Sequence, residues 1–512
     1  MHNYRLYYEK LTWHDPEKVF LSLYGNKKYT FWLDNNSTNQ SPGNNYSYMG
    51  ITNKTIKYSI SNHTLSISNN SNPPTGGQKL HQNIFTYLQK ELLSWKGVAS
   101  AGEPRRAPAA NKVSEDVGRG KRETGPLFDF TGGFVGYFGY EIGKDVPPGT
   151  SQFPDAYLFF IDKFLAFDHS QKSLYLVALS KEKNRAEQWF STTKNQLSRL
   201  LHKKQIKQYN NLTIQQFNNT MPLFTFSRSR RQYLKDIRTC QKYLAAGDAY
   251  QICLTNQITV NTKTNWPQPR STWLTLFRTL RKTNPAPASA YINFGNFALL
   301  SSSPEQFLHV DKNGWVTSKP MKGTIQRGET RKKDLRLARR LGKSKKDYAE
   351  NIMIVDLVRN DLGKACVIGS IKVTKPLEVQ TYATVHQLIS TIKGKLRPES
   401  TIIDLLEASF PGGSMTGAPK IAACKIIKEL EKTPRGIYSG TFGFLGLNGT
   451  ANLAMTIRTI IATKDNLSFG SGGAILSDSK PQEEYNEMLL KAQPLMVAIT
   501  KTVGAKTFRL NS

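Results

Sequence analysis

The sequence predicts an α+β protein, because strand-like runs occur together with segments of helical periodicity. Two runs rich in aromatic and aliphatic residues, Tyr157–His169 and Ser173–Leu179, are typical of strands. Further along, the strand-like run Tyr291–Pro304 is followed by segments with the spacing of strong helices. The glycines of Phe130–Glu141 interrupt an aromatic strand, which is typical of bulges or of close backbone approach.

Two segments differ in composition from the rest of the chain. Residues 98–125 mix Ala, Pro, Gly and charged residues, which favours a loop or an insertion. Residues 202–222 are polar and rich in Asn and Gln, as connectors often are. The second segment is the better boundary, and it divides the chain into an N-terminal region, 1–222, and a C-terminal region, 223–512.

The bulk composition is that of a soluble globular protein. The 512 residues are 38% hydrophobic and 21% charged, and no run of about 18 uncharged apolar residues indicates a membrane-spanning helix. The first residues lack the apolar core of a signal peptide, so we expect a cytoplasmic protein. The four cysteines are scattered without CxxC spacing, which argues against a zinc site and against a disulfide framework.

The formal net charge of +32 leaves two interpretations open. One is a nucleic-acid or other anionic partner, and the other is a lysine-rich, solvated surface. The most basic run, residues 327–346, contains no aromatic residue on which bases could stack. Because no DNA- or RNA-binding pattern accompanies it, the sequence favours the solvated surface over a nucleic-acid partner.

The helical segment Gln482–Met496 carries charged residues on one face. Glu484, Glu487 and Lys491 follow a spacing of i, i+3 and i+7, beside an apolar stripe. Two carboxylates and an ammonium could hold a divalent cation and an anionic substrate. Taken alone, a solvated helix face with a Glu487–Lys491 ion pair is the simpler interpretation.

A second helix is predicted over residues 346–365. Tyr348, Ile352 and Val355 form its apolar stripe, and Glu350 lies in its N-terminal half. That carboxylate is either a solvated surface group or a ligand for a hard cation.

Glycine-rich segments and one arginine point to an anionic small molecule. Residues 410–431 run from a Gly-rich turn with Ser414 and Thr416 into an amphipathic helix, whose N-terminus favours an anion. The segment "FGSGGA", 469–474, is interpreted as a second glycine turn; neither segment has nucleotide-binding spacing. Arg458, expected within a strand, needs an anionic partner if it is buried. Ordinary turns and a surface arginine remain the alternative.

An ordered series of motifs resembles the chorismate-utilising enzymes, which include anthranilate synthase component I, aminodeoxychorismate synthase component I and the isochorismate synthases. The motifs are "GDAYQICLTN", "SSSPEQFL", "KPMKGTIQRG", "DYAENIMIVDLVRNDLG", "FPGGSMTGAPK", "RGIYSGTFGF", "TIRT" and "SGGAILSDSKPQEEYNEMLLKA". The resemblance covers Arg228 to Ala505 closely and the N-terminal region loosely. It implies a large α/β sandwich with the active site between two β-sheets.

The resemblance also implies a set of site residues. Glu350 and Glu487 are the expected ligands of a Mg²⁺ ion, with Glu484 beside them. Contacts to the substrate's carboxylates are expected from a larger set: Arg458, Lys491, Tyr438, Thr416, Gly417, Ser471, Gly472 and Gly473. His386 matches the family's histidine, an expected catalytic residue. If these roles hold, the charged faces of the helices predicted at 346–365 and 482–496 belong to the active site and are not simply solvated surface.

Lys322 selects one branch of the family. Gln251 stands where the isochorismate synthases use a lysine to activate water, and an amide cannot act as a general base. Anthranilate synthases carry alanine at the position of Lys322, whereas aminodeoxychorismate synthases use a lysine there as a nucleophile. A lysine with the reference pKa of about 10.4 must lose a proton before it can attack. Glu305 matches the family's general acid, and Cys253 and Asn256 depart from the usual residues.

The resemblance implies chorismate as substrate and ammonia as co-substrate. None of the four cysteines lies in the Gly-flanked turn that a glutaminase nucleophile needs. We therefore expect a separate glutamine amidotransferase subunit, or free ammonia, and 4-amino-4-deoxychorismate as product. Anthranilate synthase component I is the nearest alternative, and a nucleic-acid-binding protein is the alternative of another class. The pattern around Tyr46–Gly50 is too loose to predict a bound tryptophan.

Overall fold

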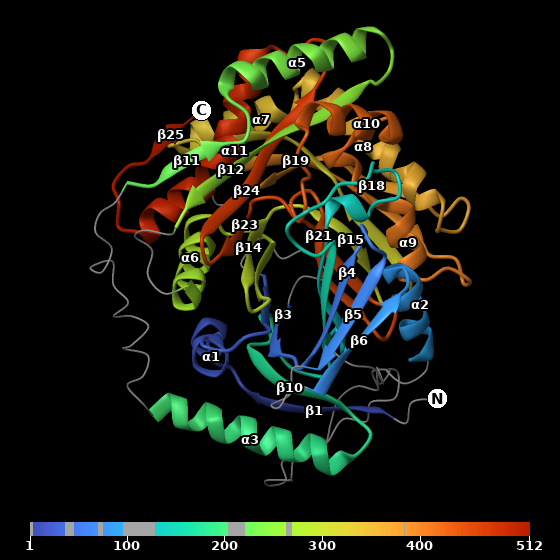
Figure 1. Ribbon diagram of the computed structural model, residues 1–512, viewed down its shortest axis with the longest axis vertical. Helices are drawn as coiled ribbons and strands as arrows, with labels where there is room; N and C mark the ends of the chain where they lie inside the picture. The colour runs from blue at the N-terminus through green and yellow to red at the C-terminus, as the bar shows by residue number, and fades with distance from the viewer. Residues whose placement is uncertain are drawn as a thin grey trace.

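The computed structural model (Figure 1) describes residues 4–35, 46–69, 75–95, 128–202, 221–262, 269–382 and 385–511. The predicted loop at 98–125 lies outside these residues, as does nearly all of the predicted connector at 202–222. In the described part of the chain, two large and mainly antiparallel sheets are flanked by helices, which confirms the α+β prediction. None of the helices in these ranges is long and apolar enough to cross a membrane.

The first sheet, sheet A, contains 13 strands among the described residues. Their order is β1-β10-β9-β3-β2-β13-β14-β23-β24-β12-β11-β25, with the short β20 paired to β12. The bounds are β1 Arg5–Thr12, β2 Thr30–Asp34, β3 Tyr46–Ile51, β9 Lys163–Asp168, β10 Ser173–Ser180, β11 Leu223–Phe226, β12 Gln251–Asn261, β13 Ala288–Asn293, β14 Phe297–Ser303, β20 Gly417–Ala418, β23 Thr459–Thr463, β24 Asn466–Ile475 and β25 Arg509–Asn511.

The second sheet, sheet B, contains 12 strands in the same described ranges. Their order is β17-β19-β16-β15-β22-β21-β7-β8-β4-β5-β6, with β18 also paired to β19. The bounds are β4 Lys54–Ser59, β5 Thr64–Asn69, β6 Thr75–His81, β7 Gly133–Phe138, β8 Ala156–Ile161, β15 Gln306–Val310, β16 Trp315–Lys319, β17 Met321–Gln326, β18 Lys372–Thr381, β19 Val385–Lys395, β21 Thr441–Gly446 and β22 Ala451–Met455.

Helices cover the outer faces of both sheets (Figure 1). Sheet A is covered by α1 Pro16–Leu23, α3 Lys183–His202, α5 Arg230–Ala245, α6 Pro269–Thr283, α10 Lys420–Glu431 and α11 Pro481–Thr502. Sheet B is covered by α2 Ile84–Ser94, α7 Arg331–Gly342, α8 Lys345–Gly363 and α9 Ile402–Ser409. Capping side chains fix several helix starts, as where Ser344 Oγ accepts the Asp347 N–H at the start of α8.

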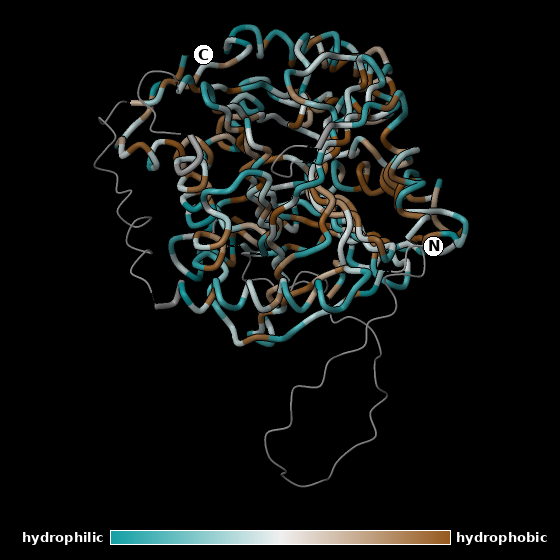
Figure 2. Tube along the Cα trace, turned by 60° about the horizontal axis from the view of Figure 1, so that its bottom comes forward, coloured by the Kyte–Doolittle hydropathy of each residue, from teal (hydrophilic) through white to brown (hydrophobic). Residues whose placement is uncertain are grey.

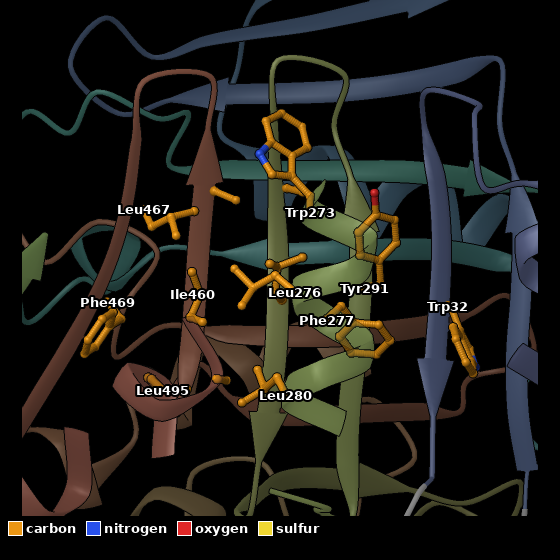
Figure 3. Packing of buried hydrophobic residues seen from close by; sticks show 14 of the residues in the cluster. Trp32, Trp273, Leu276, Phe277, Leu280, Tyr291, Ile460, Leu467, Phe469 and Leu495 are labelled. Carbon is orange, nitrogen blue, oxygen red and sulfur yellow. The ribbon is translucent and has the colours of Figure 1, made fainter. Parts of the chain in front are cut away.

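Three apolar cores follow from this layering. One lies between the sheets, where the ring of Tyr48 on β3 meets that of Phe444 on β21 with centroids 5.8 Å apart. The largest lies between sheet A and its helices, and Figure 3 shows Phe277 of α6 packed near Tyr291 and Trp32. The third joins sheet B to its helices. In Figure 2 the brown, hydrophobic stretches accordingly lie mostly in the interior of the molecule.

The run predicted as strand over Tyr157–His169 forms two strands in different sheets. β8 belongs to sheet B and β9 to sheet A, and the chain crosses between them at Asp162. The run Tyr157–His169 is almost continuously apolar because nearly every residue of both strands is buried. Both sheets also draw strands from either side of residue 222.

Candidate active site

Lys322 lies on β17, an edge strand of sheet B that packs against α8. The predicted strand and turn at 317–328 form β16 and β17, and a bulge follows Lys322 on β17. Gly323 in that bulge has φ +75°, and a Cβ there would lie 2.8 Å from Asp347 Oδ1 of α8. This close approach brings the half-buried Lys322 beside α8, and its charge acts on Glu350, Glu305 and Glu487.

Glu305 is buried in the short link between β14 and β15. Its backbone is fixed because its carbonyl accepts the Met455 N–H at 3.1 Å. Burial raises the pKa of Glu305 to about 7, although a hydrogen bond with Ser414 and the charges of Lys322 and Lys491 lower it. A carboxyl group with this pKa is partly protonated near neutral pH, as a general acid must be.

Replacement of Glu305 by glutamine is expected to change stability in a pH-dependent manner. The pKa of Glu305 is raised from 4.5 in the unfolded chain to about 7 in the folded protein. Ionisation of the buried carboxyl group therefore lowers the stability of the folded wild type above pH 7, and this destabilisation disappears as the pH falls toward 4.5. Glu305→Gln should therefore be more stable than wild type by about 3 kcal/mol at pH 8 and equal to it near pH 4.5. Urea denaturation at both pH values measures this difference, and a pH-independent difference would contradict the assignment.

Helix α8 buries polar as well as apolar residues, and the prediction of its apolar stripe holds only in part. Tyr348 and Ile352 of that stripe are exposed and Val355 is buried, and Glu350 and Asn351 are buried as well. The reason is that the inner face of this helix packs over β17 and β19 beside Lys322, where polar groups are gathered. Burial and Glu487 raise the pKa of Glu350, and Lys322 and Lys346 oppose this rise.

Helix α11 brings its charged stripe to the same place, as predicted. Glu484 is buried and accepts hydrogen bonds from Ser479 Oγ at 2.7 Å and Lys346 Nζ at 3.2 Å. Glu487 Oε1 lies 2.6 Å from Lys491 Nζ, which lowers the pKa of Glu487. Burial opposes the charged form of Lys491, yet the pKa of Lys491 is raised because Glu487 accepts its hydrogen bond.

The three glutamates offer the hard oxygen donors that Mg²⁺ prefers. A Cβ built on Gly473 would lie 3.4 Å from an oxygen of Glu484 and 3.4 Å from one of Glu487, so both carboxylates lie beside this glycine. In the described ranges no three acidic, histidine or cysteine side chains are grouped closely enough to hold a metal ion as they stand. Their carboxylates are instead paired with lysines, so the donor set suits a hard cation only after rearrangement of those pairs.

The segment predicted as a second glycine turn is part of a strand. Ser471, Gly472 and Gly473 lie within β24, opposite β12, because glycine permits a very close approach of the two backbones. A Cβ on Gly472 would overlap the Leu254 carbonyl. The Gly472 carbonyl accepts a hydrogen bond from Lys491 Nζ at 3.1 Å, and Ser471 Oγ donates to Met488 of α11.

Arg458 lies in a bend between β22 and β23, and the prediction of a strand position was wrong. Its φ of +51° is uncommon for a residue with a side chain and marks a backbone that the surrounding strands hold in place. Burial lowers the pKa of Arg458 to about 10, so the guanidinium stays charged at neutral pH. In the described part of the chain no carboxylate pairs with it, which leaves this cation available to an anionic ligand.

Tyr438 lines a cavity of about 220 Å³ together with Arg228, Asn256, Glu431 and Gly470. It is also near enough to Arg458 to interact with the guanidinium electrostatically. Burial raises the pKa of Tyr438 well above its usual range, so the phenol stays neutral. Its ring lies directly against Gly470, where any Cβ would overlap it.

A methyl group at Gly470 is therefore expected to displace Tyr438. Gly470→Ala should raise the KM for the anionic substrate about tenfold and change kcat less, because the ring is a wall of the site. Steady-state kinetics measures both constants, and Gly363→Ala, at the end of α8 where a methyl group would meet only the Ile371 side chain at 3.8 Å, is the control. Equal KM values for Gly470→Ala and wild type would exclude Tyr438 from the substrate's surroundings.

The Gly-rich turn before α10 is organised by backbone contacts. Gly417 has φ +142° and lies so close to the Gln251 carbonyl that no side chain fits. Thr416 is fully buried, and its hydroxyl donates weakly to the carbonyls of Gly412 and Gly413 at 3.5 and 3.4 Å. This turn places Ser414 against Glu305, a contact that the sequence did not predict.

His386, the predicted catalytic histidine, has no described contact with the acids and lysines of this site. It is buried on β19, with Nδ1 2.9 Å from Thr381 Oγ1 and Nε2 2.9 Å from Asp334 Oδ1. Asp334 also receives two hydrogen bonds from Arg327 at 2.8 Å each. Both ring nitrogens are thus occupied on the α7 side of sheet B.

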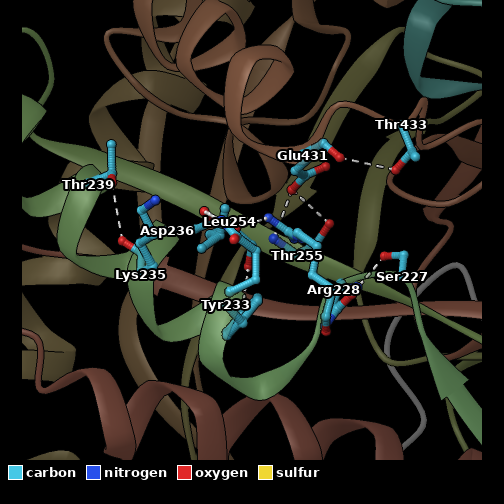
Figure 4. A network of polar contacts seen from close by, with 12 residues as sticks. Ser227, Arg228, Tyr233, Lys235, Asp236, Thr239, Leu254, Thr255, Glu431 and Thr433 are labelled. Atoms are coloured by element: carbon cyan, nitrogen blue, oxygen red, sulfur yellow. Dashed lines mark hydrogen bonds and ion pairs between the residues drawn. The ribbon is translucent and has the colours of Figure 1, made fainter. Parts of the chain in front are cut away.

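A buried ion pair that the sequence analysis missed supports the site. Arg435 donates to both oxygens of Glu431, at 2.9 and 2.7 Å, and to the carbonyls of Cys253 and Met415. Glu431 also accepts from Thr255, as Figure 4 shows. The i, i+4 spacing of the two residues was visible in the sequence, but their burial was not. Through Cys253 and Met415, the pair joins β12 to the Gly-rich turn.

The two departures from the family pattern have structural roles. The Asn256 side chain accepts from Ser227 Oγ and the Arg228 N–H and donates to the Arg228 carbonyl. Cys253 is buried, and the charges of Arg435, Lys322 and Lys491 act on its thiol. Burial raises the pKa of Cys253, so this thiol is not activated as a nucleophile.

Comparison with known proteins places this site in a family. A family model described as chorismate binding enzyme matches residues 73–497. The chain belongs to the chorismate-binding enzymes. It is 36% identical over 497 residues to the chloroplastic aminodeoxychorismate synthase of Arabidopsis thaliana, covering 93% of this chain and 51% of that protein. It is 41% identical over 375 residues to the aminodeoxychorismate synthase of Streptomyces griseus, covering 72% and 50%.

The fold of this chorismate-binding enzyme is also that of a solved relative. Anthranilate synthase component I from Streptococcus pneumoniae superposes with a TM-score of 0.70 at 25% identity, covering 95% of this chain and 99% of that one. The expected two-sheet architecture of the family is thus confirmed. The chain spans about half the length of the two aminodeoxychorismate synthases that it matches.

Proposed function

We propose that this chorismate-binding enzyme aminates chorismate to 4-amino-4-deoxychorismate, a precursor of 4-aminobenzoate and folate. The observation that carries the proposal is the position of Lys322, whose charge acts on Glu305, Glu350 and Glu487 together. The names of two relatives, which match 93% and 72% of this chain, support the same branch of the family.

In this proposal Lys322 is the nucleophile. After it loses a proton, Nζ forms a bond to ring C2, both ring double bonds shift by one position, and the C4 hydroxyl departs. Ammonia then forms a bond to C4, both double bonds shift back, and the C2–N bond breaks to return the lysine. The added nitrogen loses one proton, which replaces the proton delivered to the departing hydroxyl, so atoms and charges balance with water as the second product.

Glu305 is the proposed proton donor to the departing hydroxyl. A hydroxide leaves poorly, and a neutral carboxyl group can deliver the proton that makes it water. The carboxylates of the substrate would lie near Arg458, Lys491 and the Tyr438 ring. Arg458 supports this arrangement because it is a half-buried cation with no carboxylate partner among the described residues.

Glu350, Glu484 and Glu487 are the proposed ligands of Mg²⁺. When bound, the ion would neutralise a carboxylate of the substrate and orient the ring. The proposed source of ammonia is a separate glutamine amidotransferase subunit, since burial keeps the pKa of all four cysteines above the usual thiol value. A glutaminase nucleophile would need a lowered pKa.

Identification of the product tests the proposal. Incubation of the chain with chorismate, Mg²⁺ and ammonium should yield a compound with the mass of aminodeoxychorismate, with no accumulation of fluorescent anthranilate. Anthranilate as the main product would favour the alternative, anthranilate synthase component I. That alternative has a specific basis, because the solved relative from Streptococcus pneumoniae carries that name.

A further inference from the structure

Lys346 lies between two of the carboxylates that are proposed to hold the metal ion. Its Nζ is 3.2 Å from Glu484 Oε1 and 3.9 Å from Glu350 Oε1. The two acids come from different helices, α11 and α8, and both are buried. A single ammonium therefore joins the two helices at the point where the proposed ligand set converges.

The charges at this point are balanced by lysines. Glu487 pairs with Lys491 at 2.6 Å, and Lys346 serves Glu484 and Glu350. Glu484 is 2% exposed, and besides Lys346 only the neutral Ser479 hydroxyl donates to it among the described residues. A buried carboxylate without a cation is costly, so Lys346 or another cation must be present here.

The Lys346 side chain can move out of this position into solvent. It is 44% exposed, it begins on the first turn of α8, and its four-carbon stem lets the ammonium swing into solvent. A divalent cation bound to the same oxygens would repel the ammonium, so the two cations exclude each other.

We propose that Lys346 is a tethered counter-ion that occupies the space between Glu350 and Glu484 until a divalent cation displaces it. The inference rests on the proposed metal role of these glutamates. It accounts for the absence of a ready-made ligand cluster in the described residues, because the ammonium holds the acids in lysine pairs. The apparent metal affinity is then the intrinsic affinity reduced by the fraction of molecules in which Lys346 occupies the site.

A Mn²⁺ titration without chorismate tests this inference. Mn²⁺ prefers the same oxygen ligands as Mg²⁺, and the free ion is counted by electron paramagnetic resonance. Lys346→Met should lower the Kd for Mn²⁺ about tenfold if Lys346 occupies the site in roughly nine molecules of ten. Lys345→Met, which removes the exposed neighbouring lysine, is the matched control and should leave the Kd unchanged, as should Lys346→Arg.

A second readout is the thermal stability of the metal-free chain. In EDTA, Lys346→Met should melt below wild type because Glu484 loses its cation, and excess Mn²⁺ should remove most of that difference. If Lys346→Met does not fold, Lys346→Gln replaces it in both measurements. An unchanged or higher Kd in the neutral variants overturns the inference. If wild type itself binds no Mn²⁺, the proposed metal role fails instead, and product identification from chorismate remains a separate test of the reaction.

Discussion

Lys322→Ala is expected to slow the amination of chorismate by about a thousandfold or more, the scale on which loss of a catalytic nucleophile acts. The fold should be retained, because Lys322 is half-buried at the edge of sheet B and its loss removes no buried ion pair. Glu350 and Glu487 would lose a neighbouring positive charge, so weaker substrate binding is a smaller, second effect. Formation of aminodeoxychorismate with saturating ammonium measures the change.

Two controls make the Lys322 prediction specific. Lys372→Ala removes an exposed lysine from β18 of the same sheet and should leave the rate unchanged. Mass spectrometry of wild type during turnover should show a chain heavier by the dehydrated substrate, and this adduct should be absent from Lys322→Ala. A rate for Lys322→Ala within a few-fold of wild type would remove this lysine from the mechanism.

The largest expected effect on stability comes from the buried pair of Arg435 and Glu431. Each residue is 7% exposed, and Arg435 donates hydrogen bonds to five oxygen atoms. Arg435→Met leaves the Glu431 carboxylate buried without its cation and should lower the free energy of unfolding by about 3–5 kcal/mol. Urea denaturation at pH 7 measures this loss.

A double variant separates the charge from the packing. Arg435→Met combined with Glu431→Gln removes both charges, and it should recover a large part of the lost stability because a neutral amide is cheaper to bury. If the double variant is as unstable as Arg435→Met alone, the loss comes from packing and from the Cys253 and Met415 carbonyls that lose their donor.

Much of the site could be predicted because its residues stand in ordered motifs on regular elements. The stripe of Glu484, Glu487 and Lys491 followed directly from helical spacing, and α11 presents it as expected. The predicted stripe of α8 was right only for Val355, because periodicity finds apolar residues and not the face that is buried. The buried face also carries Glu350 and Asn351, since it packs over a polar site.

The backbone at the site was harder to predict from sequence. The glycines of β24 suggest a turn in the sequence. In the structure they allow β24 and β12 to approach closely, because a side chain at Gly472 would overlap the Leu254 carbonyl of β12. Arg458 was expected in a strand because its neighbours are β-branched, but its φ of +51° is imposed by the connection between β22 and β23. The Lys346 contact with Glu484 joins residues 138 positions apart and has no local signal.

The crossing of the chain from β8 in sheet B to β9 in sheet A has a consequence for any attempt to isolate the second region. Within sheet A, β2 is the neighbour of β13, and within sheet B, β7 is the neighbour of β21. Removal of residues 1–222 would uncover an apolar strand edge on both sheets at once, with unpaired backbone donors and acceptors. Residues 223–512 expressed alone should therefore aggregate, although they carry every residue of the candidate site.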